Sequence, residues 1–96
     1  MLKRKGFRDK DKIKVTFVLP DGSPQASVVG DFNDWDPEAN PLIRRSNHTY
    51  STAVELDEGG RYEFRYRLEN GEWWNEDDAD EQVSNEFGET NSVILT

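Results

Sequence analysis

The 96-residue sequence contains no cysteine, one histidine and one methionine. Without cysteine there can be no disulfide, no thiolate nucleophile and no cysteine-based metal site. No apolar run approaches the ~20 residues of a membrane-spanning helix, and the charged start lacks the apolar stretch of a signal peptide. We therefore expect a cytoplasmic protein with no membrane partner. Its length suits a single hydrophobic core and falls far short of an eight-stranded α/β barrel enzyme.

The sequence has fewer basic than acidic residues, with 12 Lys and Arg against 20 Asp and Glu, and its net charge is -8. Seven of the twelve lie near the start of the chain: Lys3, Arg4, Lys5, Arg8, Lys10, Lys12 and Lys14. The remainder is strongly acidic and would repel a phosphate backbone, so we expect no nucleic-acid partner. We predict a flexible basic N-terminal arm over residues 1–11 and one folded domain over residues 12–96. The arm is either a solvated terminus or a contact for an acidic partner.

Apolar and polar residues alternate along several short segments, as they do in β-strands, and no segment has the period of an amphipathic helix. Clusters of Gly, Pro, Asn and Asp recur about every ten residues and predict turns. We predict strands over Lys12–Leu19, Gln25–Gly30, Tyr50–Leu56, Arg61–Leu68 and Ser92–Thr96, with a short edge strand over Pro41–Arg45. The pattern predicts an all-β antiparallel sandwich whose core includes Val15, Phe17, Val54, Tyr62, Phe64 and Tyr66.

Three tryptophans are more than so small a core requires. If Trp73 and Trp74 are both extended, one should lie in the core and the other should be exposed, because neighbouring strand residues point to opposite faces. Trp35 belongs to a polar loop that Phe32 is expected to anchor. Exposed indoles indicate a binding site, and their flat rings suit the apolar face of a sugar. An equally simple interpretation is that Trp35 and Trp73 cover the ends of the sandwich.

The acidic residues offer weaker candidates for chemistry. The stretch Glu76–Glu81 and the cluster Asp31, Asp34 and Asp36 carry oxygen ligands suited to calcium, but neither fits the EF-hand pattern. We interpret both as solvated loops and expect no metal and no cofactor. Paired carboxylates hydrolyse glycosides only within a walled site, which an open sandwich face lacks. His48 lies in a polar turn, so we predict no catalytic residue and no enzyme activity.

The run Gly30-Asp31-Phe32-Asn33-Asp34-Trp35, followed by Pro41-Leu42, resembles the GxFNxW…PL signature of carbohydrate-binding module family 48, the isoamylase N-terminal domain. The similarity continues through Glu58-Gly59-Gly60, Phe64-Arg65-Tyr66, Asn70-Gly71-Glu72-Trp73 and the segment Asn85–Val93. The family includes the glycogen-binding domain of the AMP-activated kinase β subunit. The resemblance implies an immunoglobulin-like β-sandwich of the early-set type.

The resemblance also implies the site residues and the function. Trp35 and Trp73 fall on the family's two stacking tryptophans, with Trp74 as the alternative to Trp73. Arg65 replaces a sugar-contacting lysine, Asn91 matches a glucose-binding asparagine, and Phe87 replaces a leucine that enters cyclic glucans. One departure is Glu89, which stands where the kinase domain has threonine.

These matches imply a monomeric, non-catalytic module that binds α-1,4-glucan such as glycogen or starch, as oligosaccharide or polysaccharide. The alternative is an accessory domain of a glycoside hydrolase family 13 type branching or debranching enzyme that contacts this glucan-active enzyme rather than sugar.

Overall fold

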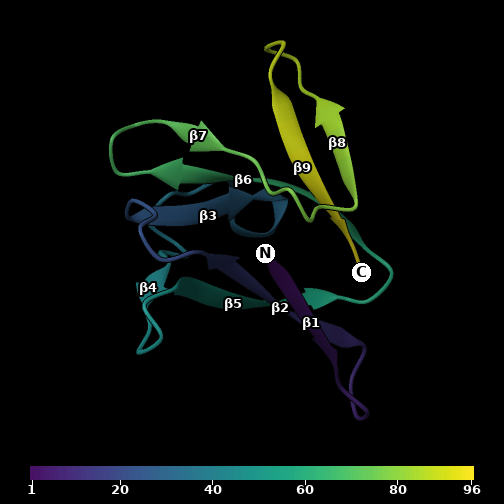
Figure 1. The fold of residues 1–96 in the computed structure, drawn as a ribbon. Coiled ribbons are helices and arrows are strands. Elements are labelled where there is room, and N and C mark those ends of the chain that lie inside the picture. The colour runs from purple at the N-terminus through teal and green to yellow at the C-terminus, as the bar shows by residue number, and fades with distance from the viewer.

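The computed structural model describes residues 1–96 and contains nine β-strands and one short 3₁₀ helix, η1 (Asp31–Asn33) (Figure 1). The strands in chain order are β1 (Leu2–Gly6), β2 (Lys12–Leu19), β3 (Ala26–Gly30), β4 (Ile43–Arg44), β5 (Tyr50–Asp57), β6 (Arg61–Leu68), β7 (Trp73–Trp74), β8 (Glu81–Ser84) and β9 (Thr90–Leu95). All six predicted strands are present, with ends that differ from the prediction by at most two residues. No helix has the length and apolar character that crossing a bilayer requires.

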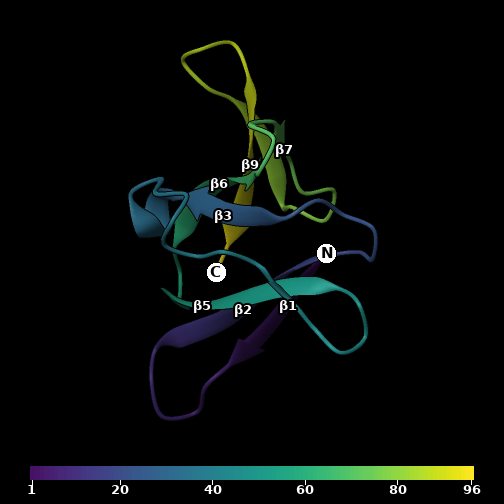
Figure 2. The same ribbon diagram turned by 90° about the vertical axis from the view of Figure 1, so that its left-hand side faces the viewer.

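The strands form two antiparallel sheets that face each other. One has the order β1-β2-β5-β4 and the other the order β3-β6-β9-β8, with β7 pairing with β6. Figure 2 shows the two layers from the side, with β2 and β5 in one and β3 and β6 in the other. The turn between β8 and β9 projects beyond both layers in both views, while the β1–β2 turn projects at the opposite end (Figures 1 and 2). The prediction of an all-β, immunoglobulin-like sandwich is confirmed.

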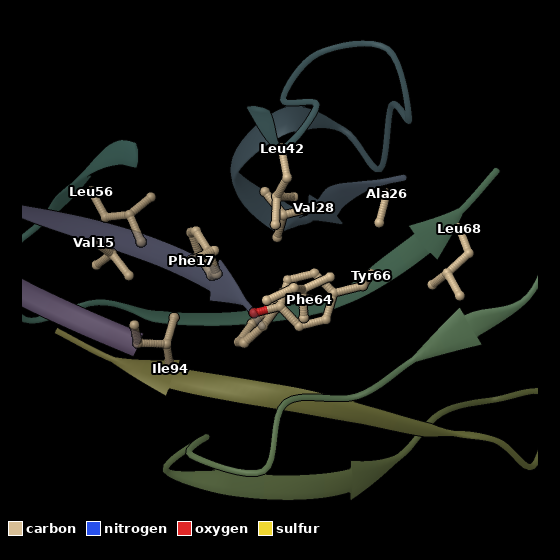
Figure 3. Close-up of a cluster of buried hydrophobic side chains, with 11 residues drawn as sticks. Val15, Phe17, Ala26, Val28, Leu42, Leu56, Phe64, Tyr66, Leu68 and Ile94 are labelled. Atoms are coloured by element: carbon tan, nitrogen blue, oxygen red, sulfur yellow. The ribbon is translucent and has the colours of Figure 1, made fainter. Parts of the chain in front are cut away.

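The core lies between the sheets and is built mainly from the inward residues of β2, β3 and β6 (Figure 3). Phe17 is at its centre, with ring centroids of Phe64 and Phe32 at 5.1 and 5.7 Å. Of the predicted core residues, Val15, Phe17, Phe64 and Tyr66 are fully buried, and Tyr62 and Val54 are partly buried against the cluster. Phe32 is also partly buried there, so it anchors the loop that carries Trp35, as expected.

The first six residues differ from the predicted arm because Leu2–Gly6 form strand β1, which pairs along β2 from Leu2 opposite Phe17 to Gly6 opposite Ile13. Leu2 packs against the core, and Arg4 donates a hydrogen bond to Asp80 at 2.9 Å. The sequence hides this strand because its three consecutive charged residues, Lys3, Arg4 and Lys5, lie at a sheet edge and resemble a solvated tail.

The stretch Glu76–Glu81, predicted to be a solvated loop, contains a buried carboxylate. Glu76 is 4% exposed. Its carboxylate accepts hydrogen bonds from the Met1 ammonium, the Tyr66 hydroxyl and the Asp78 amide. Its backbone amide donates to Ser92 Oγ. Burial disfavours the charged form, but the hydrogen bonds from Met1, Asp78 and Tyr66 outweigh it and hold the pKa of Glu76 below its ordinary value. Burial, with the nearby Glu76 charge, raises the pKa of Tyr66. Glu76 therefore connects the N-terminus, β6 and β9 through buried hydrogen bonds.

Candidate functional site

An open cavity of about 590 Å³ lies against the sheet that contains β6 and β9. Its lining comes from four separate parts of the chain: the loop after β3, the outward side chains of β6, the start of β7 and the β8–β9 turn with the adjoining end of β9. The five residues that the sequence singles out for binding all line it: Trp35, Arg65, Trp73, Phe87 and Asn91. Its volume is within the range of ligand-binding pockets.

Trp35 is held in place by the loop that follows β3. The backbone of Asp34 and Trp35 has φ of 57° and 58°, a left-handed conformation that turns the chain sharply, and the Trp35 amide donates to the Gly30 carbonyl at 3.0 Å. The indole Nε1 donates to Asp31 Oδ1 at 3.1 Å, and Asp31 Oδ2 accepts from the Glu63 amide at 2.8 Å. Asp31 thus ties the indole of Trp35 to strand β6.

The same loop depends on a close approach of two backbones at Gly30. A Cβ at this position would lie 2.5 Å from the Glu63 carbonyl oxygen and 2.7 Å from Phe64 Cβ, which no other residue could tolerate without movement of the chain. Asn33 closes the loop, since its side chain accepts from the Gly30 amide at 3.0 Å and donates to the Val28 carbonyl at 3.0 Å. The Gly-Asp-Phe-Asn-Asp-Trp run is therefore a structural unit that presents one indole.

Trp73 presents the second indole from strand β7. It pairs with Arg67 of β6, and the guanidinium carbons of Arg65 and Arg67 both lie 4.9 Å from its ring centroid. These cation–π contacts fix the ring against the outer face of β6. Trp74 pairs with Tyr66, points to the other face and does not line the cavity.

The prediction that one of these two tryptophans is buried is wrong, because Trp73 is 38% and Trp74 36% exposed. Strand β7 has two residues and pairs only with Tyr66 and Arg67 of β6, beyond the segment of β6 that pairs with β9. At this corner of the sandwich neither face of β7 is fully covered, so alternation does not bury either indole.

Arg65 is committed to a neighbouring carboxylate. Its Nη1 lies 2.6 Å from Glu89 Oε2, and its side chain is only 12% exposed. Its Nε is buried and has no hydrogen-bond partner. The sequence marks Glu89 as a departure from the related kinase domain, and the structure shows that Glu89 is the direct partner of Arg65.

Asn91 lies deeper than a loop residue, since it belongs to β9 and is 7% exposed. Its Nδ2 donates to Glu63 Oε1 and its Oδ1 accepts from Asn85 Nδ2, both at 3.2 Å. The nitrogen and the oxygen of the Asn91 side-chain amide are therefore both hydrogen-bonded within the protein. These bonds connect side chains of β6, β9 and the β8–β9 turn where they line the cavity.

Phe87 stands at the rim and is 80% exposed. The turn that carries it is closed by Asn85, whose Oδ1 accepts from the amides of Phe87 and Glu89 at 2.9 and 3.0 Å. Gly88 adopts the left-handed conformation that the turn needs, with φ of 78°. A large apolar ring held so far into solvent is the most exposed hydrophobic side chain of the protein.

Sequence reasoning missed other lining residues, namely Asp31, Glu63, Asn85 and Glu86. The signal for Glu63 was available, because it lies two residues before Arg65 and so shares the outward face of β6. The Asn-Glu-Phe-Gly order of a turn was a weaker signal for Asn85. No group of three or more His, Cys, Asp or Glu side chains is arranged to hold a metal ion.

The sequence matches the family Carbohydrate-binding module 48 (Isoamylase N-terminal domain) over residues 8–80. It is 37% identical over 78 residues to an amylopullulanase of Thermoanaerobacter thermohydrosulfuricus, a match that covers 69% of this chain and 5% of that enzyme. It is 35% identical over 88 residues to an amylopullulanase of Thermoanaerobacterium thermosulfurigenes, covering 86% of this chain and 4% of that enzyme. The chain thus spans about one twentieth of the length of these relatives. With the cavity described above, these matches show that the chain belongs to carbohydrate-binding module family 48.

Proposed function

We propose that this chain is a non-catalytic module that binds α-1,4-linked glucose chains such as glycogen and starch. The observation that carries the proposal is that two indoles from distant parts of the chain, Trp35 and Trp73, line one open cavity. A pyranose ring presents a face of C–H groups that packs on an indole and a rim of hydroxyls that needs hydrogen-bonding groups beside it. The cavity offers both kinds of surface.

Each residue has a distinct part in this proposal. Trp35 and Trp73 stack on glucose rings, and Phe87 covers the outer edge of the bound chain from the β8–β9 turn. Arg65 donates to hydroxyls through Nη2, the terminal nitrogen that Glu89 leaves unoccupied. Asn91 donates the Nδ2 hydrogen that Glu63 does not take, because an amide nitrogen carries two.

The energetics favour a weak single site. One stack contributes about 1–2 kcal/mol by apolar-area bookkeeping. Two stacks and a few hydrogen bonds, less the cost of ordering the sugar, correspond to a dissociation constant on the order of 0.01–1 mM. Such an affinity is useful on a polymer, where many sites lie close together and rebinding is frequent.

Binding without catalysis is supported by the openness of the site. Glycoside hydrolysis needs two carboxyl groups in a walled pocket that sets their proton affinities apart. Here Trp73 is 38% and Phe87 80% exposed, so the rim faces water. A bound sugar would be held on one side only.

The relatives suggest the setting in which the module works. Both are amylopullulanases, and the matched segment is a small part of each. We propose that the module, acting as a monomer, keeps a glucan-active enzyme close to its polymer. A second candidate function follows from the same matches: the domain packs on the enzyme and contacts protein rather than sugar.

The test is a titration with β-cyclodextrin or maltoheptaose in which binding is measured by calorimetry and by tryptophan fluorescence. The wild-type protein should show saturable binding. Trp35→Ala and Trp73→Ala should each weaken binding by about 5- to 30-fold, the equivalent of one stack. Trp74→Ala is the matched control, because it removes an equally exposed indole outside the cavity.

The titrations of the wild type and the three variants together separate the two candidate functions. Full affinity in Trp74→Ala with loss in the other two variants supports the glucan site. A flat titration of the folded wild-type protein contradicts it and favours the domain that contacts protein.

A further inference from the structure

The wall of the cavity is acidic. Four carboxylates line it, those of Asp31, Glu63, Glu86 and Glu89, against one guanidinium, that of Arg65, which gives a formal charge of -3. Glu86 makes no ion pair. Any ligand in the cavity therefore meets a negative field that water and salt only partly screen.

The one cation of the wall is neutralised by the protein itself. Arg65 Nη1 lies 2.6 Å from Glu89 Oε2, a charge-assisted contact, and the side chain is 12% exposed. The ion pair leaves Arg65 able to donate a hydrogen bond but cancels most of its attraction for an anion. A phosphate or carboxylate group could accept a hydrogen bond from Nη2, but it would then lie beside the Glu89 carboxylate, and it could take the full charge of Arg65 only by displacing Glu89.

The neighbouring cations of β6 are engaged as well. Arg61 pairs with Glu63 at 3.2 Å and with Glu81 at 3.6 Å, and Arg67 packs on the Trp73 ring and donates to the Gly71 carbonyl. The β1–β2 turn projects from the end of the molecule opposite the β8–β9 turn (Figures 1 and 2), and its flanking strands carry Lys3, Arg4, Lys5, Lys12 and Lys14. No other cationic side chain lines the cavity.

We propose that this site selects uncharged glucan chains and rejects glucans that carry phosphate or carboxylate groups, with Glu89 as the residue that determines the selectivity. The inference rests on the proposed function and adds a substrate class to it. Glu89 acts in two ways, since it contributes negative charge to the wall and holds Arg65 away from anionic ligands.

The expected size of the effect follows from simple electrostatics. A phosphate monoester carries about -1.5 to -2 charges at neutral pH. Arg61, which pairs with Glu63, and Arg67, which packs on Trp73, reduce the charge of -3 to about -1 to -2. At roughly 10 Å, each phosphate group should therefore weaken binding by about 2- to 5-fold at low ionic strength. The effect should shrink as salt is added, because screening shortens the reach of the field.

The experiment compares β-cyclodextrin with β-cyclodextrin phosphorylated at O6 of every glucose, so that no binding register avoids the charge. β-Cyclodextrin methylated at O6 is the steric control. The wild-type protein should bind the two neutral rings with similar affinity and the phosphorylated ring about 10-fold or more weakly in 20 mM salt, with a smaller gap in 500 mM salt.

Two variants assign the selectivity. Glu89→Gln and Glu86→Gln change the charge of the wall equally, but only Glu89→Gln releases Arg65 from its ion pair. Glu89→Gln should therefore narrow the gap between neutral and phosphorylated rings by several-fold more than Glu86→Gln, because a freed guanidinium binds phosphate well.

The outcomes are distinguishable. If neutral β-cyclodextrin does not bind, the proposed function fails and this inference fails with it. If neutral and phosphorylated rings bind the wild type equally, the inference alone is overturned. If both variants narrow the gap to the same extent, Glu89 is not the determinant.

Discussion

Asp31 allows the link between loop structure and binding to be tested. Its two carboxylate oxygens accept from Trp35 Nε1 and from the Glu63 amide, so one small side chain fixes the indole relative to β6. Asp31→Ala removes both hydrogen bonds but does not remove any of the rings proposed to stack on sugar. The indole would then have to be ordered by the sugar rather than by the protein.

The magnitude can be estimated from that ordering. Immobilising a side chain on binding costs about 0.5–1.5 kcal/mol, which corresponds to a loss of about 2- to 12-fold in affinity. The free energy of unfolding should also fall by about 0.5–1.5 kcal/mol, since the Glu63 amide loses its protein acceptor.

The assay is a calorimetric titration of β-cyclodextrin into wild type, Asp31→Ala and Asp31→Asn. The asparagine variant keeps a carbonyl oxygen for Trp35 Nε1, but its amide nitrogen cannot accept from Glu63, so its affinity should lie between the other two. Thermal unfolding of each variant shows that the fold is kept. If folded Asp31→Ala binds as tightly as wild type, then Asp31 does not hold Trp35 in its binding position and the reasoning is refuted.

Two further predictions concern the framework. The pKa of Glu76 in the folded protein lies below its ordinary value of 4.5, so its contribution to stability is full above that pH and is lost as the pH falls through the folded-state pKa. Denaturant unfolding between about pH 3 and 6 should therefore show a flatter pH dependence in Glu76→Gln; an unchanged slope would contradict this. Gly30→Ala should destabilise the fold by about 1–3 kcal/mol, because the new methyl group would overlap β6. Gly6→Ala is its control, since a Cβ there would lie 3.6 Å from Ile13, an ordinary contact, and equal unfolding midpoints would show that the close approach at Gly30 is not needed.

The sandwich could be predicted where a strand has one buried and one solvated face. In β6, Phe64, Tyr66 and Leu68 alternate with charged residues, and the pattern gives both the strand and its inward face. Strand β8 carries no such pattern, because Glu81–Ser84 has one apolar residue, Val83, and is mostly exposed, and its pairing partner lies beyond a turn. It forms through backbone hydrogen bonds to β9, which leave no trace in the residue types.

The sequence singles out five residues that line one cavity, but it does not predict the contacts that connect them. The resemblance to the family points to Trp35 and Trp73, and both line the cavity. The Arg65–Glu89 ion pair depends on the position of the β8–β9 turn over β6, which is a property of tertiary structure. The burial of Glu76 also depends on tertiary structure. An acidic stretch of sequence predicts a solvated loop, and only the fold shows that Glu76 accepts a hydrogen bond from the Tyr66 hydroxyl.

The measurement that tests the account most directly is the set of nuclear Overhauser contacts between indole protons and sugar C–H protons in the complex with maltoheptaose. The account predicts contacts from both Trp35 and Trp73 to the pyranose faces and none from Trp74. Contacts to Trp74 alone, or saturable binding with no contact to either cavity indole, would contradict it.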